Sequence, residues 1–217
     1  MTPRSERLAL AHGACVIVEL DDAAADAALA ALAPDEQRLA GELGPVRRRE
    51  LVAGRTALHL ALGAGDRVAI LSDDRGAPIL PPGWTGSVSH KAAHDAILAA
   101  ALVAPAAAGH VGIDLELAAA PRTDIARRVL TPREQAQLPD RGRAVTLRFA
   151  IKEAIYKAID RHLRRYVGFT EVELDFDLDP GLGGGEVAVT TALPFAIEAT
   201  WREHAGHWLA TARAVPR

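Results

Sequence analysis

Residues 111–117 alternate between two kinds of side chain. Ile113, Leu115 and Leu117 are apolar, and Asp114 and Glu116 between them are acidic. Because side chains of a β-strand point alternately to opposite faces, this period of two predicts a strand with one apolar and one acidic face. Two carboxylates on one face repel each other unless a positive group lies between them, and Mg²⁺ takes such oxygen ligands. A half-exposed strand with solvated acids would give the same pattern, so the segment alone leaves both interpretations open.

The composition limits the class of protein. The chain has 217 residues, of which 49% are hydrophobic, enough for one ordinary domain or two small ones with a core. Its net charge of −3 excludes a nucleic-acid binder that works by bulk positive charge. Cys15 is the only cysteine, so no intramolecular disulfide can form. The most apolar stretch, residues 96–108, is broken by Pro105 and is too short to span a membrane. We therefore expect a cytoplasmic protein that binds neither membranes nor nucleic acid.

The order of the expected elements suggests two similar halves. Strands are predicted at residues 15–20, 68–71, 95–103, 111–117, 171–177, 186–190, 195–202 and 208–214, and a Gly/Pro-rich loop at 73–86. Helices are predicted at residues 22–33, from Pro34, from Pro45 to 62, at 123–130, from a capping box at Thr131, and at 145–162. We predict an α+β fold made of a pseudo-twofold pair of similar α/β subdomains, over residues 1–105 and 106–217.

The helix expected at residues 145–162 carries two kinds of face. Leu147 and Ile151 begin an apolar stripe, whereas Glu153 and Lys157 lie four residues apart on a neighbouring face, the favourable order for an ion pair. Lys152 and Lys157 are two of only three lysines in the chain, and a compact ammonium suits a phosphate. The helix therefore offers a third carboxylate beside two cations. A surface helix with one stabilising ion pair is the alternative.

Two further segments could bind phosphates. Residues 81–91 combine glycines and prolines with Ser89 and His90, whose side chains can donate hydrogen bonds to phosphate oxygens. A Gly/Pro loop leading into a strand is the alternative, and the nucleophile elbow Gly-x-Ser-x-Gly of a hydrolase is missing from the sequence. The helix from Pro45 begins with Arg47, Arg48 and Arg49, an arrangement that is unfavourable with the helix dipole and that a bound anion would relieve. A solvated helix start is the alternative there.

In this order, the pieces resemble the 4′-phosphopantetheinyl transferases built from two fused halves, as in the surfactin and enterobactin systems. The matching segments are Gly54-Arg55, Gly76-Ala77-Pro78, and residues 86–90, 111–116, 130–134 and 149–158. The combination of Gly-Ile-Asp-x-Glu with Lys-Glu-x-x-x-Lys is more specific than either motif alone.

The resemblance implies an activity and a set of site residues. Members of the family move 4′-phosphopantetheine from coenzyme A to a serine of an apo acyl or peptidyl carrier protein, and release 3′,5′-ADP. The implied metal ligands for Mg²⁺, with Mn²⁺ as the other candidate ion, are Asp114, Glu116 and Glu153. Glu153 would also accept the serine proton, and Lys157 would neutralise the pyrophosphate during the reaction. The implied coenzyme A contacts are Arg47, Arg48, Arg55, Arg75, Ser89, His90, Lys152 and Lys157.

The sequence departs from the family pattern on the nucleotide side. Ala77 stands where some members have lysine, so Arg75 is the candidate substitute, and His59 stands where arginine is common. Lys91 follows His90 where a small hydroxyl residue is usual. The resemblance further implies a cleft between the halves, a monomer, and a role in fatty acid, polyketide or nonribosomal peptide biosynthesis.

Two other functions are compatible with parts of the pattern. One is a different Mg²⁺-dependent enzyme that cleaves a phosphoryl or pyrophosphate bond without a carrier protein. The other is a non-catalytic module that binds coenzyme A or a carrier protein, although such a module has no need of Glu153 and Lys157 beside two further carboxylates.

Overall fold

The computed structural model divides the chain into two compact units, Met1–Ala108 and Gly109–Arg217. The structure describes residues 3–63, 68–93, 95–138, 142–176 and 183–217. Among these residues, no helix is both long enough and apolar enough to cross a membrane.

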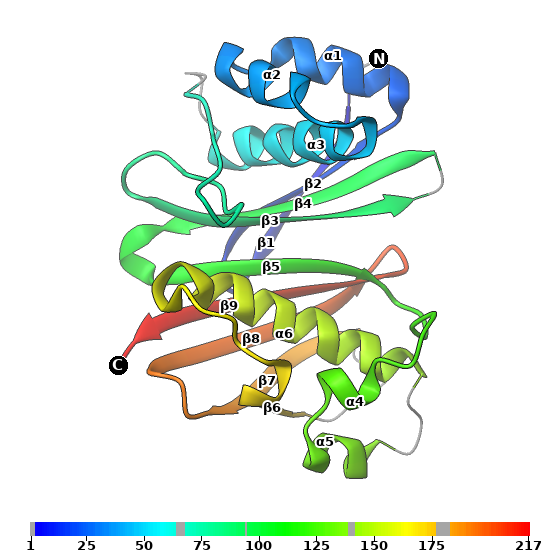
Figure 1. Cartoon of the computed structure of the whole chain (residues 1–217), viewed down its shortest axis with the longest axis vertical. Helices are drawn as coiled ribbons and strands as arrows, with labels where there is room; N and C mark the ends of the chain where they lie inside the picture. Colours follow the sequence, from blue (N-terminus) through cyan, green and yellow to red (C-terminus); the bar gives the residue numbers. More distant parts are fainter. Residues whose placement is uncertain (1–2, 64–67, 94, 139–141, 177–182) are drawn as a thin grey trace. The chain divides into compact units, whose positions relative to one another are not determined.

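Unit 1 is an antiparallel sheet with three helices on one face (Figure 1). Its strands lie in the order β1-β2-β4-β3. The strands are β1 (Arg4–Leu10), β2 (Gly13–Leu20), β3 (Trp84–Ala93) and β4 (Ala96–Pro105), and the helices are α1 (Asp22–Ala31), α2 (Pro34–Gly41) and α3 (Pro45–Leu62).

Helix α3 covers the sheet of unit 1. Val16 and Val18 of β2 point to the side of α3 and form a core with Ala57 and Leu58, all nearly inaccessible to solvent. The helix begins at Pro45, whose fixed φ and missing N–H suit a first helical position. It ends at Leu62 and is capped by Gly63, which adopts the left-handed φ of 64° that glycine tolerates best.

Unit 2 repeats this plan with a longer sheet. Its strands lie in the order β5-β9-β8-β7-β6. The strands are β5 (His110–Leu117), β6 (Val172–Asp175), β7 (Gly184–Thr191), β8 (Phe195–His204) and β9 (His207–Pro216). The helices are α4 (Ala126–Val129), α5 (Pro132–Gln137) and α6 (Gly142–Leu163), with short 3₁₀ turns η1 (Ala106–Ala108) at the end of unit 1 and η2 (Phe169–Glu171) in unit 2.

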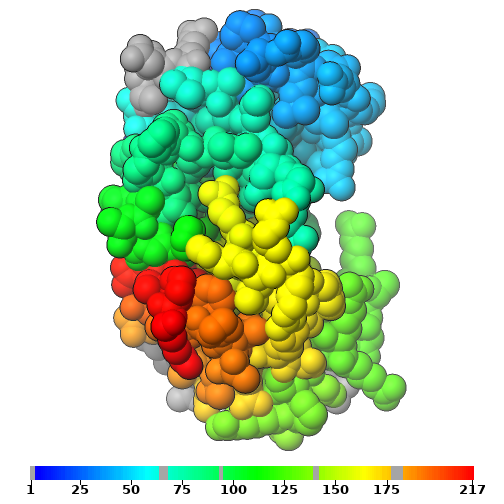
Figure 2. All heavy atoms as spheres, turned by 60° about the vertical axis from the view of Figure 1, so that its left-hand side comes forward, coloured from blue at the N-terminus to red at the C-terminus, as the bar shows by residue number. Residues whose placement is uncertain are grey.

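Helix α6 occupies the place in unit 2 that α3 has in unit 1. Its apolar stripe, including Leu147, Ile151 and Ile155, packs on β8 and β9 through Ala199, Trp208 and Ala212. The second half of α6 and the segment after it, yellow in Figure 2, reach the surface of the unit.

The two units share one topology. In each, a strand (β2 or β5) leads into three helices and pairs with the last strand of the unit (β4 or β9), which pairs in turn with the strand before it (β3 or β8). β1 in unit 1, and β6 and β7 in unit 2, extend this common arrangement. The prediction of an α+β fold with two similar subdomains is confirmed.

Three parts of unit 1 differ from the prediction. Residues 84–93, expected to begin as a Gly/Pro loop, form β3 instead, because they pair with the very apolar β4 along its whole length. Residues 68–71, expected to be a strand, have no strand partner in the described chain, and the neighbouring Ser72 makes only an isolated bridge to Pro78. The pairing strand β1 was not predicted, since its mostly exposed side chains give no clear alternation. Asp177, the expected end of one strand, lies outside the described residues.

Gly112 lets α6 lie directly on β5. A Cβ atom at this position would lie 1.9 Å from the carbonyl oxygen of Ala154 and 2.8 Å from the backbone nitrogen of Ala158. Both are backbone atoms of α6, so no side-chain rotation could relieve the overlap. The glycine of the Gly-Ile-Asp motif is therefore required for packing.

We predict that Gly112→Ala lowers the free energy of unfolding by about 1–3 kcal/mol, because the added methyl group pushes α6 away from β5. Chemical denaturation measures the effect. Gly41→Ala is the matched control, since a Cβ there meets no atom within 4 Å. Equal stability of the Gly112 variant and the wild type would contradict the close approach.

A pair of histidines in unit 2 is expected to make its stability depend on pH. The rings of His110 and His162 lie 4.0 Å apart, edge to face. Burial lowers the pKa of His110, and the positive charges of His162 and Arg161 lower it further. As the pH falls below the usual histidine value, the unfolded chain therefore binds a proton at His110 that the folded chain does not.

We predict that the free energy of unfolding decreases as the pH is lowered from 7.5 to about 5, and that His110→Gln removes part of this decrease. Denaturation curves across the pH series test this. The same slope in both proteins would show that His110 does not contribute.

Candidate active site

The centre of the candidate site is an ion pair between β5 and α6. Lys157 Nζ lies 2.7 Å from Asp114 Oδ1 and also donates a hydrogen bond to the Ile113 carbonyl oxygen at 3.1 Å. The Asp114 side chain is 7% exposed and that of Lys157 is 27% exposed. The close packing at Gly112 brings the two elements near enough for this contact. The sequence pattern had suggested that Lys157 pairs with Glu153 along the helix, whereas its hydrogen bonds go across to the strand.

Glu153 lies one turn before Lys157 on α6 and is half-buried. Burial raises the pKa of Glu153, and the nearby carboxylates of Asp114 and Glu116 raise it as well, whereas Lys157 and Arg128 lower it. The three predicted metal ligands are thus close enough to influence one another. Their mutual repulsion is of the kind that a bound cation relieves.

The carboxylates do not form a closed metal cage in this structure. Within the described ranges, no three His, Cys, Asp or Glu side chains are gathered around a common point. The chemistry of Asp114, Glu116 and Glu153 nevertheless fits Mg²⁺, which prefers oxygen ligands and is commonly bound through one or two carboxylates together with the phosphates of a substrate.

Lys152 lies away from this group. Its ammonium is nearly inaccessible and donates hydrogen bonds to Glu134 Oε2 at 2.7 Å and to the Val129 carbonyl oxygen at 2.9 Å. A buried cation whose donors are engaged by the protein is poorly placed to contact a phosphate. We therefore leave Lys152 out of the coenzyme A site, contrary to the expectation from the sequence.

Arg55 is also turned inward. It is 3% exposed, its Nε donates to the Ile70 carbonyl oxygen, and its Nη2 donates to Ser72 Oγ at 2.8 Å. The predicted contact with a 3′-phosphate does not fit this placement, because the guanidinium is held inside unit 1 by the segment that follows α3.

The directions of the Ser89 and His90 side chains are set by their position in β3. As neighbours on a strand they point to opposite faces. Ser89 is 6% exposed. The His90 ring is partly exposed, with Nδ1 3.5 Å from Glu50 Oε1, and Glu50 also accepts a hydrogen bond from Arg47 at 2.9 Å. The structure therefore brings His90 and Arg47 together through Glu50 and separates the side chain of Ser89 from them.

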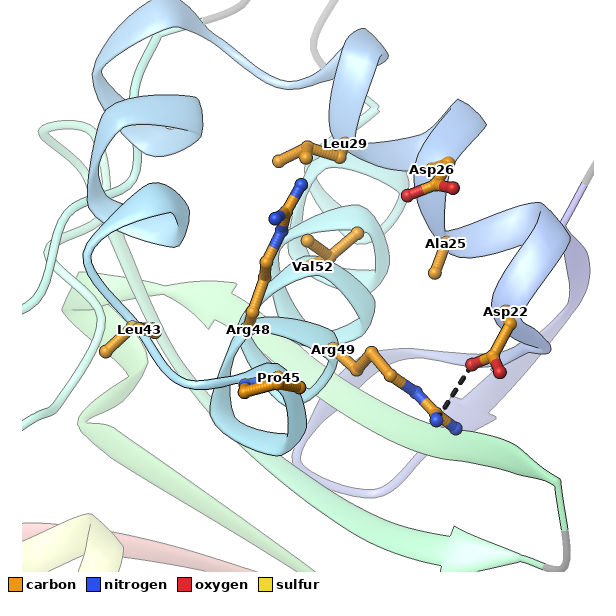
Figure 3. A pocket seen from close by; sticks show the side chains of 9 residues that line it. All are labelled: Asp22, Ala25, Asp26, Leu29, Leu43, Pro45, Arg48, Arg49 and Val52. Atoms are coloured by element: carbon orange, nitrogen blue, oxygen red, sulfur yellow. Dashed lines mark ion pairs between the residues drawn. The ribbon is translucent and has the colours of Figure 1, made fainter.

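Arg48 lies beside a pocket between α1 and α3 (Figure 3). The pocket has a volume of about 300 Å³ and is lined by Asp22, Ala25, Asp26, Leu29, Leu43, Pro45, Arg48, Arg49 and Val52. Arg49 pairs with Asp22 at 2.8 Å, whereas Arg48 extends toward Leu29.

Arg75 is exposed on the turn that follows Ser72, and its backbone N–H donates to Asp73 Oδ1.

Comparison with known proteins identifies the family. Residues 110–211 match the model of the 4′-phosphopantetheinyl transferase superfamily, and residues 35–104 match that of the 4′-phosphopantetheinyl transferase N-terminal domain. The chain is 33% identical to the 4′-phosphopantetheinyl transferase Npt of Nocardia iowensis over 68% of either chain. The chain belongs to the 4′-phosphopantetheinyl transferase family. It is 29% identical to the 4′-phosphopantetheinyl transferase PptT of Mycobacterium tuberculosis, over 67% of this chain and 66% of that protein.

The protein is thus an enzyme of the class that transfers phosphopantetheine groups. Residues 35–104, which match the N-terminal domain model, lie in unit 1, and residues 110–211, which match the superfamily model, lie in unit 2.

One charged residue near the candidate site of this transferase was not predicted from the sequence. Arg128 of α4 lies near enough to Glu153 to lower the pKa of that carboxyl group, and its side chain is exposed. The pair Arg127-Arg128 was visible within the predicted helix at 123–130, but nothing in the spacing connects it with a carboxylate on another helix.

We predict that Lys157→Met lowers the free energy of unfolding by roughly 1–3 kcal/mol, because Asp114 is left buried without its cation. The same substitution in an Asp114→Asn background should cost clearly less, since no charge remains to be compensated. A double-mutant cycle by chemical denaturation measures the difference. Equal costs in both backgrounds would show that the ion pair contributes no coupling.

Proposed function

We propose that this transferase moves the 4′-phosphopantetheine group of coenzyme A to a serine hydroxyl of an apo acyl or peptidyl carrier protein, and releases 3′,5′-ADP. The observation that supports this is the group of Asp114, Glu153 and Lys157, which carries acidic and basic chemistry at one place on β5 and α6. The similarity to two named 4′-phosphopantetheinyl transferases supports the same reaction.

The proposed reaction is a displacement at phosphorus. The serine oxygen forms a bond to the phosphorus that bears pantetheine, and the bond from that phosphorus to the bridging oxygen breaks, so that the oxygen leaves with 3′,5′-ADP. Glu153 accepts the serine proton. Lys157 stabilises the negative charge that grows on the bridging oxygen, a role in which a fixed cation lowers the barrier.

A divalent cation complements these residues. Asp114, Glu116 and Glu153 would hold Mg²⁺ or Mn²⁺, which when bound neutralises charge on the pyrophosphate. Arg128 adds a positive charge near Glu153 and is assigned to the pyrophosphate as well.

The nucleotide part of coenzyme A is assigned to residues of unit 1. Arg47, Arg48, Arg75, Ser89 and His90 remain candidates by resemblance. Arg47 and His90 are the best supported, because Glu50 holds both and they are partly or largely exposed. The division of labour between residues 1–105 and 106–217, a monomeric state, a cytoplasmic location and a polyketide or nonribosomal peptide pathway remain predictions.

Intact-protein mass spectrometry of apo carrier proteins tests the proposal. Each carrier is incubated with this protein and coenzyme A, in Mg²⁺ and in EDTA. We expect one carrier to gain a single phosphopantetheine in Mg²⁺ only, with release of 3′,5′-ADP. Cleavage of coenzyme A without a modified carrier would favour a different pyrophosphate-cleaving enzyme, and binding without turnover would favour a binding module.

We predict that Glu153→Gln lowers kcat by at least about a hundredfold and leaves the circular dichroism spectrum unchanged, because the amide can neither accept the serine proton nor carry the charge of a metal ligand. The control is Glu42→Gln, an exposed glutamate at the end of α2. A rate close to that of the wild type would remove Glu153 from the mechanism.

A further inference from the structure

A six-residue pattern, Leu-x-Pro-x-Glu-Gln, occurs once in each unit. It covers residues 32–37 in unit 1 and 130–135 in unit 2 and begins helices α2 and α5. Glu36 and Glu134 are both 0% exposed. Each accepts a hydrogen bond from the backbone N–H three residues earlier, at 2.9 Å for Glu36 and 2.7 Å for Glu134. The two buried glutamates are therefore equivalent positions of the duplicated fold.

The partners of these glutamates are equivalent as well. The long helix of each unit donates to the carboxylate, from His59 Nε2 at 2.9 Å in unit 1 and from Lys152 Nζ at 2.7 Å in unit 2. An arginine four residues earlier, Arg55 or Arg148, lies buried near each glutamate. Burial alone would raise the pKa of Glu36, but its hydrogen bonds to His59 and the backbone hold that pKa below the usual value.

In unit 1 this group fastens the segment that follows α3. The N–H of Ile70 donates to Glu36 Oε1 at 3.0 Å, and the carbonyl oxygen of Ile70 accepts from Arg55 Nε. Arg55 Nη2 also reaches Ser72 Oγ at 2.8 Å. The backbone N–H and C=O of Ile70 are thus both bound by buried charged side chains. These two hydrogen bonds fix the position and the direction of the chain at Ile70.

The segment after Ile70 is itself a tight turn. Asp73 Oδ1 accepts from the backbone N–H groups of Arg75 and Ala77, at 2.9 Å each. Ser72 bridges to Pro78, and the Ile79 N–H donates to the Leu71 carbonyl oxygen at 2.9 Å. These hydrogen bonds connect both sides of the turn, so contacts that hold Ile70 and Ser72 also constrain the position of residues 73–78.

We propose that Glu36, Arg55 and His59, named here the unit-1 clasp, are positioning residues that hold residues 70–79 in the conformation that binds coenzyme A. This rests on the proposed function, in which Arg75 of that turn contacts the nucleotide part. Arg55 then acts through the turn and does not touch the 3′-phosphate. His59 takes the place that Lys152 has in unit 2, so the second half of the chain indicates which substitution should preserve the clasp.

Hydrogen exchange tests the clasp without reference to activity. In His59→Leu, we expect faster exchange in peptides covering residues 68–80 than in the wild type, and nearly wild-type exchange in β2 and β4. His59→Lys should restore slow exchange, because an ammonium can donate to Glu36 as Lys152 donates to Glu134. Val52→Ala, a truncation of a buried side chain on the same helix, controls for general loss of stability and should not produce the local pattern.

Kinetics test the link to coenzyme A. We expect His59→Leu to raise the KM for coenzyme A about tenfold with kcat changed less, and His59→Lys to restore the KM. Arg55→Ala should raise the KM for coenzyme A and for 3′-dephospho-coenzyme A by the same factor. A larger effect on coenzyme A than on its dephospho form in Arg55→Ala, without the same difference in His59→Leu, would place Arg55 on the 3′-phosphate and overturn this part of the proposal.

The outcomes separate this proposal from the proposed function. Failure of the wild-type protein to modify any carrier would overturn the transferase reaction. Wild-type transfer combined with unchanged exchange of residues 68–80 in His59→Leu would overturn the clasp. The clasp would also be overturned if His59→Lys behaved like His59→Leu, or if Val52→Ala gave the same local change in exchange.

Discussion

The contact on which the rest of unit 2 depends is the approach of one backbone to another, where α6 lies on β5 at Gly112. Because no Cβ separates them there, α6 comes close enough for Lys157 to reach Asp114 across the interface. The apolar stripe of α6 then packs on the neighbouring strands, so the same approach organises the core of the unit. The packing of α6 and the Lys157–Asp114 ion pair therefore both depend on Gly112, and a larger side chain there should disturb both.

Both units contain a buried glutamate with several hydrogen bonds, but the segments that the two glutamates hold are different. In unit 1, Glu36 and its partners hold a tight turn that is proposed to meet coenzyme A. In unit 2, Glu134 holds Lys152 and the backbone of β6, next to the helix face that carries Glu153. A buried carboxylate with several hydrogen bonds is costly to leave unsatisfied, which makes the geometry around it hard to change. The same buried carboxylate, with a backbone partner and a helix partner, is thus present in both units.

Charge in the candidate site is balanced only in part by the protein. Asp114 has Lys157 beside it, but burial and two neighbouring carboxylates still raise the pKa of Glu153. Arg128 offsets part of this repulsion from α4. A site left with excess negative charge, next to cations that can meet phosphates, suits a reaction in which a cation and a polyanionic substrate arrive together.

The sequence by itself determined the class of fold and most of the elements, because those properties follow from local periodicity. The grouping of Asp114 with Glu153 and Lys157 was implied only by the family resemblance, since Asp114 lies far from the other two residues along the chain. Only the tertiary structure decided that residues 84–93 are a strand, since their partner β4 supplies the pairing. It also turned Lys152 and Arg55 inward, toward Glu134 in one unit and the Ile70 backbone in the other. The partner of a charged side chain is set by which distant segments meet around it, and spacing along a helix carries no information about that.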